Sequence, residues 1–177
     1  MDVLEKVRAT LGSYNGTDVR GMLKADHQVI LELVKELDEA ASSPQRRALV
    51  ARLKPVLVAH SRAEEQAVYV PMTKVAGSPD ARMAGSEGAV EHSLADTVLG
   101  RLFDTEDAST DMWKAHAKVL RELLEHHIKE EEGELFEELG EHFSDKERDA
   151  MGVRFAKHKE ELLEGMTQAT SAHGKRV

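Results

Sequence analysis

The stretches HSRAE and HIKEE, at residues 60–64 and 127–131, each place a histidine four positions before a glutamate. Residues i and i+4 lie on the same face of an α-helix, about 6 Å apart along its axis. Each stretch can therefore offer an imidazole nitrogen and a carboxylate to one point beside its helix. One such pair alone carries little weight, because nine histidines make chance matches common. The two pairs are His60/Glu64 and His127/Glu131.

Both pairs lie on the apolar face of a long predicted helix, one at about residues 44–74 and the other at about 110–142. A glutamate on an apolar face is costly to bury unless it is paired or bound to a metal. The pair His126/Glu130 has the same spacing but lies about 100° around the helix. We expect that pair to face solvent or to support the site from outside.

Two further predicted helices each carry one histidine on an apolar face, His27 on the first and His92 on the third. A single histidine of this kind is more often a hydrogen-bonded core residue than a ligand. Four imidazoles and two carboxylates converging in a dry core would, however, leave several buried polar groups without partners. We therefore predict that these six side chains bind metal.

The helical spacing of apolar residues and the scarcity of proline predict an all-α fold. Four long helices joined by loops of modest length favour an antiparallel, up-and-down four-helix bundle. A short helix precedes it at residues 2–12, and a capping box at Ser144 starts a C-terminal fifth helix. The longest loop is predicted at residues 77–88. We expect a single domain over residues 1–177, with the core bundle at about 18–142 and the extension helix at about 144–166.

The composition excludes several classes of function. The chain has no cysteine, which excludes disulfides, iron–sulfur clusters, thiolate zinc sites and cysteine nucleophiles. Its net charge of −9 makes nucleic acid an unfavourable partner. No apolar run approaches the roughly 20 residues needed to span a bilayer, and the N-terminus lacks a signal-peptide pattern. We expect a cytoplasmic protein without a membrane partner, either a monomer or a homodimer.

Nitrogen and oxygen ligands without thiolates favour iron or manganese and allow zinc. The six side chains supply fewer bonds than two six-coordinate ions need, which leaves positions for oxo, hydroxo, water or a small ligand. The Glu-x-x-His pairs of ferritin-like bundles and the His-Glu-x-x-His motif of zinc proteases are absent from the sequence.

With these motifs the chain resembles the hemerythrin-like HHE cation-binding family over about residues 20–142. The matching segments are Asp26-His27, HSRAEEQAVYVP (60–71), Glu91-His92 and HHIKEEEGELF (126–136). The resemblance implies a hemerythrin-like four-helix bundle with two iron ions, oxo- or hydroxo-bridged, in preference to manganese or zinc. It also implies the role of each ligand: His27, His60, His92 and His127 as terminal ligands, and Glu64 and Glu131 as bridges.

One position departs from the oxygen-carrying members of that family, which have a further histidine one turn after the third-helix histidine. Asp96 stands there instead, either as a carboxylate ligand or pointing away. Either case disfavours stable oxygen carriage. Tyr69 is interpreted as a packing or rim residue rather than as a ligand.

Three functions remain open at this point. The favoured one is a non-haem di-iron protein that binds or reacts with dioxygen, nitric oxide or hydrogen peroxide. The second is an iron storage or sensing module that acts through partner contacts. The third is a purely structural bundle, which requires that the inward-facing histidines and glutamates do not destabilise the core. Whether the protein is an enzyme is also open; an enzymatic role would be peroxide or nitric oxide metabolism by a di-iron oxidoreductase.

Overall fold

The computed structural model describes residues 17–173, so the short helix predicted for residues 2–12 lies outside the described residues. Within the described range the chain forms helices and no β-strand, which confirms the all-α prediction. The elements are α2 (Val19–Glu39), α3 (Ser43–Glu64), η1 (Glu65–Tyr69), α4 (Val70–Met72), α5 (Pro79–Asp104), α6 (Asp111–Glu130), η2 (Glu131–Leu135), α7 (Phe136–His142) and α8 (Asp145–His173).

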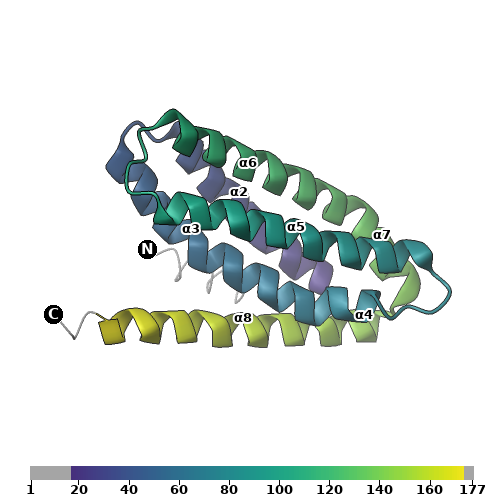
Figure 1. Cartoon of the computed structure of the whole chain (residues 1–177). Helices are drawn as coiled ribbons and strands as arrows, with labels where there is room; N and C mark the ends of the chain where they lie inside the picture. The colour runs from purple at the N-terminus through teal and green to yellow at the C-terminus, as the bar shows by residue number, and fades with distance from the viewer. Residues whose placement is uncertain (1–16, 174–177) are drawn as a thin grey trace.

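Two long helical segments of the chain each consist of three consecutive elements. The π-helix η1 joins α3 to α4, and the π-helix η2 joins α6 to α7. Figure 1 shows α2, α3, α5 and α6 side by side, with α8 running along the outside of the group. The packing contacts of α8 are mainly with α2 and α3. None of the described helices has an apolar stretch long enough to cross a bilayer.

Local capping explains where the helices begin. The Ser42 side chain accepts a hydrogen bond from the Gln45 backbone N–H, and the Gln45 side chain accepts one from the Ser42 N–H. Ser144 and Glu147 form the same reciprocal pair before α8. These capping boxes satisfy backbone donors that the first helical turn leaves free.

The loop predicted at residues 77–88 is wrong, because the structure begins α5 at Pro79. Ser78 caps the helix with its side chain, and Pro79 suits a first turn, where a missing N–H is harmless. The glycines suggested a loop, but only Gly77, at positive φ, lies in one, whereas Gly85 and Gly88 allow close packing of the helix. A Cβ atom at Gly88 would lie 2.5 Å from the Tyr69 ring.

Two hydrophobic clusters lie along the bundle with a polar layer between them. One cluster includes Ile30, Leu57 and Leu99, and the other includes Leu23 and Val68. Along α2 and α5, the buried polar residues fall between the members of one cluster and those of the other, and along α3 and α6 they lie where one cluster gives way to the other. The buried polar residues of these helices, including their π segments, are Asp26, His27, His60, Ser61, Glu64, His92, His127 and Glu131.

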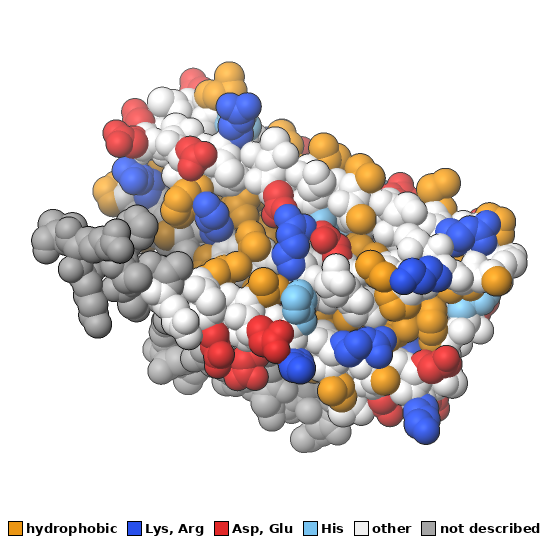
Figure 2. Space-filling model, turned by 60° about the horizontal axis from the view of Figure 1, so that its bottom comes forward, with side chains coloured by type: hydrophobic (Ala, Val, Ile, Leu, Met, Phe, Trp, Pro, Cys, Tyr) orange, Lys and Arg blue, Asp and Glu red, His pale blue; other side chains and the backbone are white. Residues whose placement is uncertain are grey.

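The fifth helix continues this layering. On α8, Phe155 belongs to one hydrophobic cluster and Leu163 to the other, and the fully buried Lys159 lies between them. The helix also continues to His173, beyond its predicted end near Met166. On the face shown in Figure 2, acidic, basic and hydrophobic side chains are interspersed.

Close contact between α8 and the start of α2 gives a stability prediction. A Cβ atom at Gly152 would lie 1.9 Å from the carbonyl oxygen of Thr17, so Gly152→Ala forces the backbones apart. We expect this variant to lose about 1–3 kcal/mol of unfolding free energy, the usual cost of overpacking. Urea unfolding measures the change.

Gly165→Ala on the same helix is the matched control, because nothing lies within 4 Å of the added Cβ atom. That control should gain up to about 1 kcal/mol from helix propensity. Equal effects of the two substitutions would contradict the packing argument.

Candidate metal centre

The structure brings all six predicted ligands together in the polar layer. Each of the four long helical segments contributes, and every one of the six is at most 4% exposed. His27 comes from α2, the pair His60/Glu64 from α3, and His92 from α5. His127 lies in the last turn of α6, one turn before Glu131, the first residue of η2.

Ligand atoms of the six residues form two overlapping groups, in each of which all atoms lie within 4.8 Å of one another. The carboxylates of Glu64 and Glu131 belong to both groups. One group adds the first two histidines and the other adds the last two. This is the arrangement that two ions sharing two carboxylates need. The groups are His27, His60, Glu64 and Glu131, and Glu64, His92, His127 and Glu131.

All four imidazoles turn the same ring nitrogen outward, toward a carboxylate. In each case Nδ1 lies within 3.3 Å of a carboxylate oxygen on another helix, so the Nδ1 proton is donated away from the centre. Such an outer carboxylate fixes the tautomer and orientation of a metal-binding histidine. The pairs are His27–Glu132 at 3.1 Å, His60–Asp26 at 3.2 Å, His92–Glu65 at 3.3 Å and His127–Glu91 at 2.7 Å.

In His92 and His127 the other ring nitrogens, Nε2, are 3.0 Å from each other, and in all four histidines the Nε2 atoms face inward. They lie 3.3–3.7 Å from the oxygens of Glu64 and Glu131. Within the described residues, His27 Nε2, both oxygens of Glu64 and Oε2 of Glu131 are buried without a hydrogen-bond partner. Buried groups of this kind require a partner. Nitrogen and carboxylate donors left open toward one centre fit iron, manganese or zinc.

The pKa values of the two inner carboxylates, Glu64 and Glu131, shift in opposite directions. Burial raises the pKa of Glu64 well above its usual value, and the charge of Glu131 raises it further. Burial acts against ionisation of Glu131 too, but the imidazoles of His127 and His27 outweigh it and lower its pKa. Without a cation, Glu64 therefore needs a proton, whereas Glu131 is ionised. A metal ion removes that need because it supplies the positive charge.

Tyr69 is one of the site residues whose role the sequence did not predict. Its buried hydroxyl donates a hydrogen bond to Oε1 of Glu131, and burial, with the negative charge of Glu131, raises its pKa and keeps the phenol protonated. In η1 the Val70 N–H bonds to the carbonyl of Glu65, five residues back. This wider turn returns Tyr69 to the inner face, which an α-helical wheel would not place it on.

The second π-helix starts at the equivalent place. The N–H of Phe136 bonds to the carbonyl of Glu131, again five residues back. Both π segments thus begin at, or directly after, the glutamate of a His-x-x-x-Glu pair. Single π turns inside α-helices are frequent at functional sites. No residue type in either segment predicts the change of helix type.

Asp96 does not join either inner ligand group. Its carboxylate pairs with Arg62, which also lies 2.6 Å from the carboxylate of Glu65, the partner of His92. The aspartate therefore acts on the centre only through this chain of contacts. The pair His126/Glu130 lies outside the centre, with a partly exposed imidazole, as the sequence predicted.

Lys159 of α8 ties the fifth helix to the centre. Its ammonium group contacts Oδ2 of Asp26, the same oxygen that faces His60 Nδ1. Burial lowers the pKa of Lys159, although Asp26 opposes that shift. Burial also disfavours ionised Asp26, but Lys159 and His60 prevail and lower its pKa. The buried ion pair of Lys159 and Asp26 thus contacts the outward-facing Nδ1 atom of His60, a predicted ligand.

The sequence model of one protein family, described as hemerythrin HHE cation binding domain, matches residues 18–139. The matched range contains all six inner residues and the four outer carboxylates. The comparison with curated proteins and the comparison with solved structures each gave no match.

The buried pair predicts an asymmetry between single and double substitution. Lys159→Met leaves Asp26 buried and uncompensated, which we expect to cost about 3–5 kcal/mol of unfolding free energy. The double variant Asp26→Asn/Lys159→Met removes both charges and should recover a large part of that loss. Denaturant unfolding of the metal-free protein measures both. A double variant that is less stable than the single one would contradict the ion-pair argument.

Proposed function

Because the chain belongs to the hemerythrin HHE cation-binding domain family, we propose that it holds two iron ions between Glu64 and Glu131 and reacts with a small ligand. The ligand is dioxygen, nitric oxide or hydrogen peroxide. Iron is the preferred metal, ahead of manganese and zinc. In this proposal His27 and His60 hold one ion, and His92 and His127 hold the other.

One observation carries the proposal: the four imidazoles all donate Nδ1–H outward and present Nε2 inward. In a purely structural core, histidines would be expected to satisfy both nitrogens. Here the four Nε2 atoms converge on two buried carboxylates; His27 Nε2 has no hydrogen-bond partner, and those of His92 and His127 have only each other, 3.0 Å apart. The third candidate, a structural bundle, offers no partner for these groups.

Iron would supply the affinity for a diatomic or peroxide ligand and the ability to exchange electrons with it. The surrounding residues orient the carboxylates, hold a proton and exclude water. Tyr69 orients the Glu131 carboxylate and keeps a proton at the edge of the centre. The two hydrophobic clusters exclude water from both ends of the polar layer.

The proposal includes the finer fold and its organisation. We infer an antiparallel, up-and-down four-helix bundle of α2, α3, α5 and α6 with their π segments and α7. The support is the short connections and the side-by-side helices of Figure 1. The bundle and α8 together form a single domain in this proposal, and its partner is the small ligand rather than nucleic acid or membrane.

A second candidate function, iron storage or sensing, is favoured by the contact between Lys159 and Asp26. This contact links the outermost helix to a predicted ligand, so loss of metal could change how α8 packs. An iron sensor requires that metal binding stabilises the fold strongly. Equal stability with and without iron would remove this candidate, whereas unchanged spectra with all three small ligands would remove the reactive one.

Removal of ligands gives the direct test. The wild-type protein, reconstituted with ferrous iron in air, should bind two irons per chain and absorb in the near ultraviolet as ferric iron does. His60→Ala/His127→Ala should bind fewer than one iron per chain, because each group of ligands loses an imidazole. His158→Ala, a partly exposed histidine of α8, is the control and should keep both irons. A wild-type protein without bound iron would overturn the proposal.

Acidification should release the metal, because an imidazole binds metal only in its neutral form. Burial favours neutral His92 and lowers its pKa, whereas in His127 burial is outweighed by the carboxylates of Glu131, Glu91 and Glu64 together, which raise the pKa. Binding should therefore weaken as the pH falls through about 6.5, with His127 protonated before His92. Dialysis at stepped pH, with circular dichroism to monitor folding, measures this. Two irons retained below about pH 4 would contradict it.

A further inference from the structure

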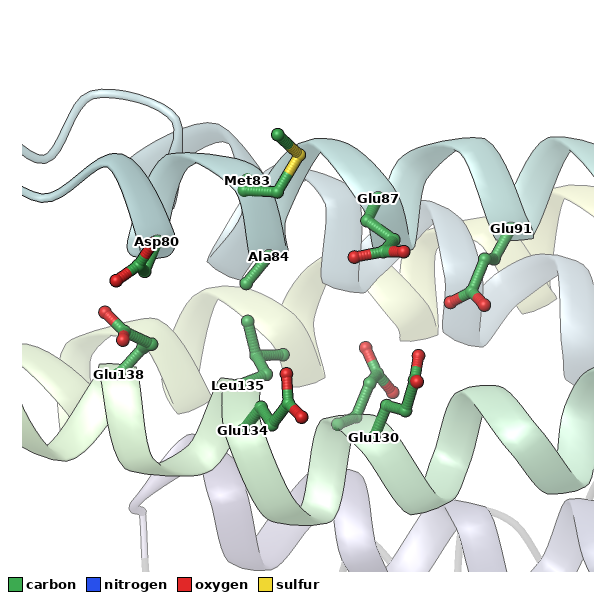
Figure 3. Close-up of a pocket in the computed structure, with 11 residues that line it drawn as sticks. Asp80, Met83, Ala84, Glu87, Glu91, Glu130, Glu134, Leu135 and Glu138 are labelled. Atoms are coloured by element: carbon green, nitrogen blue, oxygen red, sulfur yellow. The ribbon is translucent and has the colours of Figure 1, made fainter.

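An acidic pocket opens on the bundle surface beside the predicted metal centre. Its volume is about 210 Å³, and it lies between α5 on one side and the η2–α7 segment with the end of α6 on the other. Figure 3 shows Asp80, Glu87 and Glu91 of α5 directed toward the opposite wall, which carries Glu130, Glu134 and Glu138. Apolar side chains contribute only a few positions of the lining.

These carboxylates lack the basic partners that acidic surface residues usually have. Within the described part of the chain, no lysine or arginine forms an ion pair with any of the six. The other outer carboxylates of the centre differ in this respect. Lys159 pairs with Asp26, Arg62 with Glu65 and Lys24 with Glu132. Glu91, the outer carboxylate that lines the pocket, is the exception.

The rim of the pocket carries a second set of metal-type ligands. Atoms of Glu91, His126 and Glu130 all lie within 4.8 Å of one another. His126 Nε2 is 3.2 Å from Glu130 and 4.0 Å from Glu91 Oε1. The other oxygen of Glu91 lies 2.7 Å from Nδ1 of His127, a predicted ligand. One carboxylate therefore touches both the exposed set and the buried centre.

The inner wall of the pocket includes Glu131, which is only 4% exposed. Its Oε2 atom is buried without a hydrogen-bond partner, and this atom faces His27 and His127. The pocket thus leads from a partly exposed histidine and two carboxylates to a buried carboxylate that has a free ligand atom. An acidic helix face that only contacts solvent would not need a buried carboxylate with a free oxygen at its inner end.

We propose that this pocket is the route by which divalent metal cations reach the buried centre, with Glu91, His126 and Glu130 as the first capture site. The inference rests on the proposed function and extends it to the uptake of ferrous iron. Carboxylates and imidazole are suitable transient ligands for such an ion, and an anionic concave surface raises the local cation concentration. Because Glu91 contacts both His126 and His127, it lies between the capture site and the buried centre.

Uptake kinetics test the route without relying on reactivity of the loaded protein. Metal-free protein is mixed anaerobically with ferrous iron, quenched at set times with a colorimetric ferrous chelator, and assayed for retained iron. The triple variant Asp80→Asn/Glu87→Gln/Glu134→Gln removes three pocket charges that touch no predicted ligand. We expect uptake about tenfold slower than in wild type, with two irons per chain at the end.

Two controls separate the route from overall charge. Glu160→Gln/Glu161→Gln/Glu164→Gln removes three charges from α8 and should leave uptake unchanged. His126→Ala should slow uptake at low iron concentration, whereas His158→Ala should not. High salt should slow wild-type uptake and narrow its difference from the pocket variant, because salt screens exposed charges.

Equal uptake rates in the pocket and α8 triple variants would overturn the route, even with two irons bound at the end. A pocket variant that stops below two irons per chain, when wild type reaches two, would also overturn it, because the carboxylates would then belong to the centre itself. A wild-type chain that binds no iron contradicts the proposed function, and the route falls with it.

Discussion

The burial of two carboxylates side by side constrains the whole middle of this bundle. Glu64 and Glu131 lie between two hydrophobic clusters, where an uncompensated charge costs several kcal/mol. Each of the four helices that reach the layer therefore supplies an inward imidazole, and each imidazole has a carboxylate behind it. The charge that remains is negative, which makes the centre a place for cations. Even the fifth helix follows this rule, since it adds the buried ammonium group of Lys159.

Much of this could be predicted from the sequence, because the ligands obey helical periodicity. A histidine and a glutamate at i and i+4 on an apolar face must point to the same place, whichever helix is the neighbour. The same periodicity predicted the all-helical fold and the exposed position of His126. That all six residues bind metal stays a prediction, although the structure brings their ligand atoms together.

Other parts of the site could not be predicted, because they depend on contacts between distant segments. The pairing of His27 with Glu132 joins residues 105 positions apart, and no local pattern specifies it. The start of α5 was misplaced because glycines usually mark loops, whereas Gly88 leaves room for the Tyr69 ring. Tyr69 was interpreted as a packing or rim residue, and its hydrogen bond to Glu131 could not be predicted, because an α-helical wheel turns Tyr69 away from the inner face.

The two π-helices carry a consequence for how this chain can change in evolution. Each π turn holds one residue more than the α turn it replaces. Loss of a single residue from η1 or η2 would therefore rotate the rest of that helix by about 100° relative to the bundle. A gap in η1 would carry Tyr69 off Glu131, and a gap in either segment would turn part of a hydrophobic cluster toward water. The metal centre thus constrains the number of residues in η1 and η2. Related chains should accept substitutions in these segments more readily than deletions.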